Sequence, residues 1–166
     1  GTVQVDGKKF PVSGLSWMDH EFSTSALSEG QVGWDWFSIQ LDNEAELMVF
    51  QIRRSDGSID PFSSGTWISP EGETTHLERD HFELQVIDSW RSPHSEGEYP
   101  AAWKLHIPSL ELELDIQPYL ADQEMNVSYA YWEGAVQING SIDGKLISGL
   151  GYVELTGYTA SMEGEF

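Results

Sequence analysis

The chain has 166 residues, and 28 acidic side chains against 8 lysines and arginines give it a formal net charge of −20. Such a charge repels nucleic-acid phosphates and anionic lipid head groups, so we expect no nucleic-acid partner and interpret the acidic residues as a solvated surface. The chain contains no cysteine, which excludes disulfides and thiolate chemistry, and no apolar run approaches the roughly 20 residues of a membrane-spanning helix.

Alternation of apolar and polar residues with a period of two dominates the first half of the chain and predicts β-strands. Strands at residues 2–5 and 9–12 flank Asp6-Gly7, a two-residue turn of the kind that closes hairpins. Longer strands are predicted at 33–41 and 46–53, and shorter ones at 65–69, 74–77 and 81–87. Residues 92–98 form the clearest predicted loop.

The second half continues this pattern with strands at 101–107, 110–117, 129–138 and 145–156. In the strand at 110–117, leucine and isoleucine alternate with acidic residues, which predicts one core face and one solvent face. Two possible turns, Asn139-Gly140 and Asp143-Gly144, separate the last two strands. About ten strands joined by short turns predict an all-β fold, an antiparallel lipocalin-like β-barrel, whose interior at about eight strands can hold one small ligand.

The first candidate site is the segment of residues 17–22, in which three titratable side chains lie between bulky apolar ones. In an extended chain Asp19 and Glu21 point to one face and His20 to the other. A carboxylate beside the indole of Trp17 loses hydration, so its pKa should rise and it could act as a general acid. A buried hydrogen-bonding cluster that anchors the chain is an equally good interpretation.

Aromatic residues gather at two further places. Trp34 and Trp36 share one face of a predicted strand, and Tyr131 and Trp132 precede Glu133. Such rings could line an apolar pocket and stabilise a developing cation by roughly 0.5 to 2 kcal/mol each. Core packing is the commoner use of aromatic side chains, and it remains open for these residues.

Metal and serine chemistry find no support in the sequence. The possible ligands show no HExxH pattern and no matching spacing, so we expect no catalytic metal; they are His20, Glu21, His76, His81, His94 and His106. No G-x-S-x-G elbow is present for a serine nucleophile.

Four segments in the same order resemble the motifs of the carotenoid 1,2-hydratase, or hydroxyneurosporene synthase, family of lipocalin-like proteins: residues 16–22, 33–37, 131–136 and 149–158. Such proteins typically carry two lipocalin-like domains, and the chain resembles the C-terminal one. We therefore interpret residues 1–22 as a leading hairpin and inter-domain segment, and residues 23–166 as a lipocalin-like β-barrel domain. The resemblance implies a second lipocalin-like domain as partner.

The resemblance also implies a hydro-lyase that adds water across an isoprenoid double bond without cofactor or metal. Asp19 would protonate the alkene to give a tertiary carbocation, and Glu21 or Glu133 would orient the incoming water. Trp17, Trp34 and Trp36 would screen the cation. His20, like Glu21, would support the barrel as much as the reaction, and Tyr131 and Trp132 would contribute to substrate binding. The expected ligand is a hydrophobic small molecule, an isoprenoid or polyene. Contact with a membrane is expected only through this substrate.

Two other functions fit the same fold, because a fold does not fix a reaction. A pericyclase of the Diels–Alder type would need a shaped apolar cavity but no obligatory acid. A carrier would bind a lipid or isoprenoid without turnover. Replacement of Asp19 distinguishes the hydratase from both, since only the hydratase requires its proton.

Overall fold

The computed structural model describes residues 1–19, 27–127 and 130–164. Strands β1 (Thr2–Val5) and β2 (Lys8–Pro11) form a separate two-stranded antiparallel sheet at the N-terminus. Asp6 and Gly7 between them have φ of 49° and 78°. Positive φ at both central residues matches the right-handed twist of the flanking strands, which is why Asp-Gly closes this hairpin.

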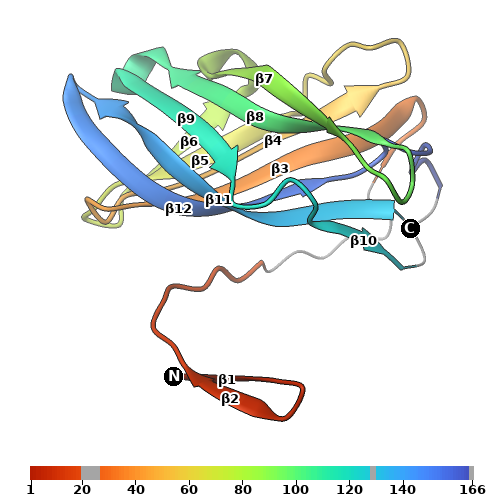
Figure 1. The fold of residues 1–166 in the computed structure, drawn as a ribbon. Helices are drawn as coiled ribbons and strands as arrows, with labels where there is room; N and C mark the ends of the chain where they lie inside the picture. The colour runs from red at the N-terminus through yellow and green to blue at the C-terminus, as the bar shows by residue number, and fades with distance from the viewer. Residues whose placement is uncertain (20–26, 128–129, 165–166) are drawn as a thin grey trace.

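The main body of the molecule is one large antiparallel sheet (Figure 1). Its strands are β3 (Gln31–Leu41), β4 (Glu46–Arg54), β5 (Ser64–Ile68), β6 (Thr74–Glu78), β7 (Glu83–Arg91), β8 (Glu98–Ile107), β9 (Leu112–Pro118), β10 (Glu124–Asn126), β11 (Ala130–Ile142) and β12 (Lys145–Leu155). They pair in the order β6-β5-β4-β3-β12-β11-β9-β8-β7, with β10 on β11. The 3₁₀ turns η1 (Arg79–His81) and η2 (Pro108–Leu110) are the helical elements in the described ranges. The predicted all-β antiparallel class is confirmed.

The sheet curls strongly but stays open along one seam. β6 and β7 follow one another through η1, yet they are the two ends of the strand order and form no ladder with each other in the part of the chain that the structure describes. Register shifts near Val86 and Asp88 disrupt the outer strand β7. Bulges of this kind bend and twist an edge strand away from a flat pairing partner. The complete closure expected from the sequence is therefore replaced by a half-closed barrel.

The concave inner face of the sheet is filled by the hydrophobic core. Leu112, Leu114 and Ile116 of β9 are all buried, as their alternation with acidic residues predicts. Trp103 of β8 lies among the core side chains, with its ring centroid 5.4 Å from that of Phe37 and in a T-shaped arrangement. The interior that was expected to hold a ligand is thus occupied by packed side chains.

An ion pair between the buried Asp35 and the partly buried Arg53 joins β3, β4 and the chain after β12. Arg53 Nε lies 3.1 Å from Asp35 Oδ1, and the Tyr158 hydroxyl donates to both carboxylate oxygens at 2.9 and 3.0 Å. The Arg53 guanidinium stacks 3.8 Å from the centroid of the Tyr158 ring and also donates to the Thr156 carbonyl. Burial raises the pKa of Asp35, while Arg53 and the Tyr158 hydroxyl favour its ionised form. This cluster fixes the C-terminal segment against the inner face.

The last hairpin differs from the sequence prediction in its length. β11 continues through Asn139-Gly140, and the reversal occurs at Asp143-Gly144, whose φ values are 50° and 70°. A Cβ atom on Gly140 would lie 2.0 Å from the Glu113 carbonyl oxygen of β9. Gly140 is therefore a site of close backbone approach inside a strand and not a turn residue.

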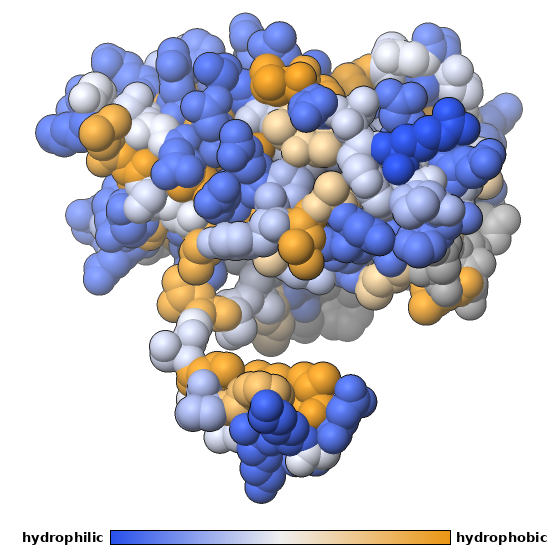
Figure 2. Space-filling view, viewed as in Figure 1, coloured by the Kyte–Doolittle hydropathy of each residue, from blue (hydrophilic) through white to orange (hydrophobic). Residues whose placement is uncertain are grey.

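The N-terminal hairpin lies apart from the large sheet (Figure 1). The pairing of Val3 with Phe10 and of Val5 with Lys8 places Val3, Val5 and Phe10 on one face, and all three are exposed. Figure 2 shows apolar side chains gathered on this hairpin. Among the described residues, no helix has the length and apolar character needed to cross a membrane.

Leu114→Ala tests the assignment of the core face of β9. Its side chain is 1% exposed, so we expect the free energy of unfolding to fall by about 2 to 5 kcal/mol, the cost of a large-to-small core substitution. Leu146→Ala is the control, because Leu146 is 94% exposed and its truncation should change stability by less than about 0.5 kcal/mol. Urea unfolding measures both, and equal losses would contradict the assignment.

Candidate active site

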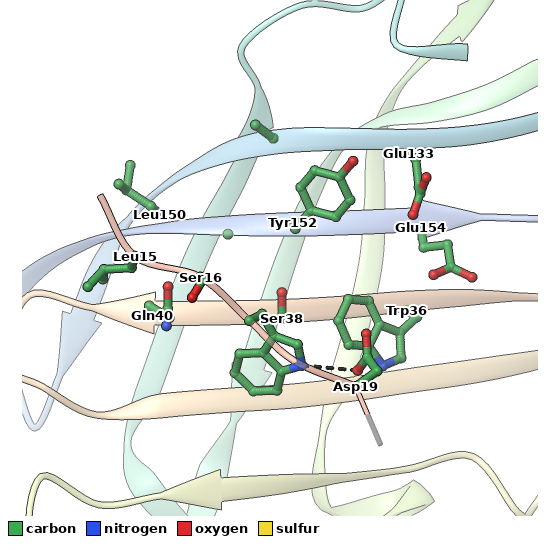
Figure 3. A pocket seen from close by; sticks show the side chains of 13 residues that line it. Leu15, Ser16, Asp19, Trp36, Ser38, Gln40, Glu133, Leu150, Tyr152 and Glu154 are labelled. Carbon is green, nitrogen blue, oxygen red and sulfur yellow. Dashed lines mark hydrogen bonds between the residues drawn. The ribbon is translucent and has the colours of Figure 1, made fainter. Parts of the chain in front are cut away.

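The candidate site is a pocket on the outer face of the sheet, where the segment after the N-terminal hairpin crosses β3, β12 and β11 (Figure 3). Its volume is about 440 Å³, which is within the range of small-molecule sites. The lining comes from four parts of the chain: Leu15, Ser16, Trp17 and Asp19; Trp36, Ser38 and Gln40; Glu133 and Ala135; and Leu150, Gly151, Tyr152 and Glu154. The site thus shares three strands with the core but lies on their other face.

Strand alternation explains which side chains reach this pocket. In β3, Phe37 and Ile39 are fully buried in the core, so Trp36 and Ser38 must point to the opposite face. The same rule holds for β12, where Val153 is buried and its neighbours Tyr152 and Glu154 line the pocket. Core packing therefore selects the residues that are presented on the outer face.

The segment after the hairpin is attached to the sheet by an aromatic contact. The rings of Trp17 and Trp36 meet edge to face with centroids 6.1 Å apart. Trp36 is only 9% exposed although it lies on the outer face. The indole Nε1 of Trp17 donates a hydrogen bond to Asp19 Oδ1 at 3.0 Å (Figure 3). Trp17 thereby covers Trp36 and holds the Asp19 carboxyl at the pocket.

Three carboxyl groups line this one pocket: Asp19, Glu133 and Glu154. The side chain of Asp19 is exposed. Glu133 is partly buried, and this desolvation raises the pKa of Glu133 above its ordinary value of 4.5. Burial, and then the charge of Glu133, raise the pKa of Tyr152. The loss of hydration that the sequence led us to expect at Asp19 is found at Glu133.

Glu154 has a more polar environment. Its Oε1 accepts a hydrogen bond from Trp34 Nε1 at 2.7 Å and another from the Tyr131 hydroxyl. The rings of Trp34 and Tyr131 meet edge to face with centroids 6.4 Å apart. Residues from β3, β11 and β12 therefore converge on this carboxylate.

The structure brings together four of the residues proposed from the sequence: Trp17, Asp19, Trp36 and Glu133 all line the pocket. Trp34 and Tyr131 lie beside it through their bonds to Glu154. His20 and Glu21 lie outside the described residues.

Trp132 is not brought to the pocket. It belongs to the inner face of β11, is 1% exposed, and donates its indole Nε1 to the Ala121 carbonyl at 2.8 Å. Its neighbours Tyr131 and Glu133 point to the other face because side chains alternate along a strand. The core use of aromatics, which the sequence left open, applies to this residue.

Sequence reasoning did not assign Ser38, Gln40, Leu150, Tyr152 or Glu154 to the site. The signal for Glu154 lies in the last hairpin. A two-residue turn at Asp143-Gly144 pairs Ile142 with Lys145, and counting outward pairs Glu133 with Glu154. With two possible turns in the sequence, this register was not determined.

One group of described residues has the spacing for a metal ion, and it lies elsewhere. Ligand atoms of Glu78, Asp80 and His81 are within 4.8 Å of one another, and all three side chains are exposed at the end of β6 and in η1. His81 Nδ1 already accepts a hydrogen bond from the backbone N–H of Glu78. This arrangement is a cap of the 3₁₀ turn and is not part of the pocket.

The pocket can supply acid–base chemistry beside aromatic surfaces. Proton donors and acceptors come from the carboxyl groups, and the indoles of Trp17 and Trp36 provide apolar, electron-rich surface. Such surface attracts a developing cation.

A family profile of AttH-like proteins matches residues 1–158. This chain belongs to the AttH-like family.

Solved structures of relatives share the fold of this AttH-like chain. An AttH-type protein from Nitrosomonas europaea is 36% identical and superimposes with a TM-score of 0.85, over 96% of this chain and 49% of that protein. Kievitone hydratase from Nectria haematococca is 22% identical and superimposes with a TM-score of 0.77, over 96% of this chain and 49% of that protein. The AttH-like chain thus spans about half the length of these relatives.

Sequence comparison also relates the AttH-like chain to a hydratase. Kievitone hydratase from Fusarium solani subsp. phaseoli is 23% identical over 163 residues, which are 87% of this chain and 41% of that protein. The comparisons therefore support the predicted relationship to lipocalin-like hydratases. The family that they identify is AttH-like and not the carotenoid 1,2-hydratases specifically.

Glu133→Gln tests the raised pKa of Glu133. Because burial raises the pKa of Glu133, the folded protein binds this proton more tightly than the unfolded chain does. The free energy of unfolding of the wild type therefore falls as the pH rises from about 4.5, the ordinary pKa, through the higher pKa of the folded state. Glutamine has no such titration. We expect the stability of Glu133→Gln relative to wild type to increase across that window and then level off.

Urea unfolding from acidic to neutral pH measures this difference. Glu113→Gln, the same substitution at an exposed position of β9 away from the pocket, is the matched control. A difference between Glu133→Gln and wild type that stays constant with pH would show that burial does not affect the titration of Glu133.

Proposed function

We propose that this chain carries part of the active site of a hydratase that adds water across a carbon–carbon double bond of a hydrophobic, isoprenoid- or carotenoid-type substrate. The observation that supports the proposal is a single pocket lined by the carboxyl groups of Asp19 and Glu133 and by the indoles of Trp17 and Trp36. The relationship to a kievitone hydratase supports hydration as the class of reaction.

In the proposed mechanism Asp19 is the general acid. Its proton passes to one alkene carbon, and the positive charge develops on the other carbon. The faces of Trp17 and Trp36 stabilise that charge by roughly 0.5 to 2 kcal/mol each and exclude other nucleophiles. Glu133, on the opposite wall, keeps its proton to a higher pH than an ordinary glutamate, so it can donate a hydrogen bond in the same pocket.

The position of the pocket supports a two-domain active site. It lies on the outer face of the sheet, and this chain spans about half of its relatives' length. We propose that a second lipocalin-like domain covers this face in the full-length protein and supplies the remaining wall. Exclusion of water by that domain would strengthen the electrostatic interactions in the site.

The carboxyl groups favour a hydratase over the two alternatives. A pericyclase requires no acid, and a carrier gains nothing from placing Asp19, Glu133 and Glu154 beside an apolar ligand, because desolvated carboxylates cost free energy. General acid–base catalysis is the use that explains their presence.

The activity test uses the full-length protein with lycopene in detergent micelles and with kievitone, both in ¹⁸O-labelled water. We expect a product heavier by one labelled water, detected by mass spectrometry, from at least one substrate. Asp19→Asn should lower turnover by about 100-fold or more, the contribution of a general acid.

The control for this test is Asp115→Asn, an exposed position on β9 outside the pocket, which should keep wild-type turnover. Full activity of Asp19→Asn would remove Asp19 from the mechanism. Quenching of tryptophan fluorescence by lycopene without any hydrated product from either substrate would identify a carrier instead.

A further inference from the structure

We infer that Glu154 is the carboxylate that activates the water molecule for addition, and that Trp34 and Tyr131 are the residues that position it. This inference rests on the proposed hydratase function and gives the water-activating role to a residue other than Glu21 or Glu133.

The geometry of the last hairpin places two glutamates side by side. Glu133 of β11 and Glu154 of β12 are direct partners in the antiparallel ladder, and both line the pocket (Figure 3). Side chains at such positions have Cβ atoms about 4.5 to 5.5 Å apart. Like charges directly opposite one another destabilise a sheet, so this pair costs stability unless the two groups differ in protonation.

Their surroundings favour different protonation states. Glu133 is desolvated, which favours its neutral form. Glu154 accepts hydrogen bonds from Trp34 Nε1, at 2.7 Å, and from the Tyr131 hydroxyl, and donors to a carboxylate favour its ionised form. Two titratable groups whose environments separate their protonation states are the arrangement from which acid and base roles are assigned. Glu154 is therefore the base of the pair.

The positions of the two donors explain why aromatic residues that do not line the pocket belong to the site. Trp34 comes from β3 and Tyr131 from β11, on either side of β12. Their edge-to-face contact holds the two donor atoms at the same oxygen of Glu154. Trp34 and Tyr131 act through Glu154 and not on the substrate.

The reaction balances with these groups alone. Asp19, the general acid of the proposed mechanism, transfers a proton to one alkene carbon as the π electron pair forms the new C–H bond, while Glu133 keeps its own proton. A water oxygen then forms the C–O bond to the carbocation, and the Glu154 carboxylate takes one proton from that water. The acid is now deprotonated and Glu154 protonated, and exchange of one proton through solvent restores both groups. No oxidant, reductant or metal is required.

The experiment compares Glu154→Gln, Tyr131→Phe and the exposed control Glu113→Gln in the full-length protein, with lycopene and kievitone as substrates and kcat measured against pH. We expect Glu154→Gln to lower kcat by about 100-fold or more with KM changed less than about threefold. Tyr131→Phe should lower kcat by about tenfold. It should also move the acidic limb of the profile to higher pH, because a less stabilised carboxylate loses its proton later. Glu113→Gln should match wild type.

Three results would overturn the inference. Glu154→Gln with kcat within about threefold of wild type would show that the carboxylate is not needed. Tyr131→Phe with reduced kcat but an unchanged acidic limb of the pH profile would show that Tyr131 has a structural role only. Because Tyr131→Phe keeps the aromatic ring, it still tests the inference if Glu154→Gln does not fold. Wild type that hydrates neither substrate would refute the proposed function itself, which distinguishes that failure from a failure of Glu154 alone.

Discussion

The geometry of the candidate site depends on the register of β3, β12 and β11, and the hydrophobic core fixes that register. Phe37, Val153 and Val136 are fully buried on the inner face of these three strands. A slip of one residue in any ladder would expose its apolar set and bury the polar one. The opposition of Glu133 and Glu154 is thus maintained by side chains that never contact the pocket.

The sequence contained enough information for the fold class and for part of the site. Period-two alternation predicted the strands, and the ordered aromatic and acidic segments brought Trp17, Asp19, Trp36 and Glu133 into one hypothesis that the pocket now unites. The register of the paired strands could not be predicted from the sequence. Both Asn139-Gly140 and Asp143-Gly144 have the chemistry of a hairpin turn, and only the close approach of β9 to Gly140 decides between them.

The location of the pocket also could not be predicted from local pattern. Alternation shows which residues share a face, but it gives neither the volume that their side chains fill nor which face remains accessible. Here Trp103, Tyr99 and Phe82 fill the concave side, so the accessible space lies on the outer face. Trp132 is another example: the local sequence is the same whether an aromatic side chain packs into the core or lines a pocket, and Trp132 packs into the core.

The interleaving of core and pocket residues along the same strands has an evolutionary consequence. Between Phe37 and Ile39 lies Ser38, and between Val153 and Leu155 lies Glu154, so the positions that line the pocket alternate with those that form the core. Replacing a pocket residue opens no cavity in the core. Substitutions that reshape the pocket can therefore occur on one face of the sheet while the stability contributed by the other face is retained.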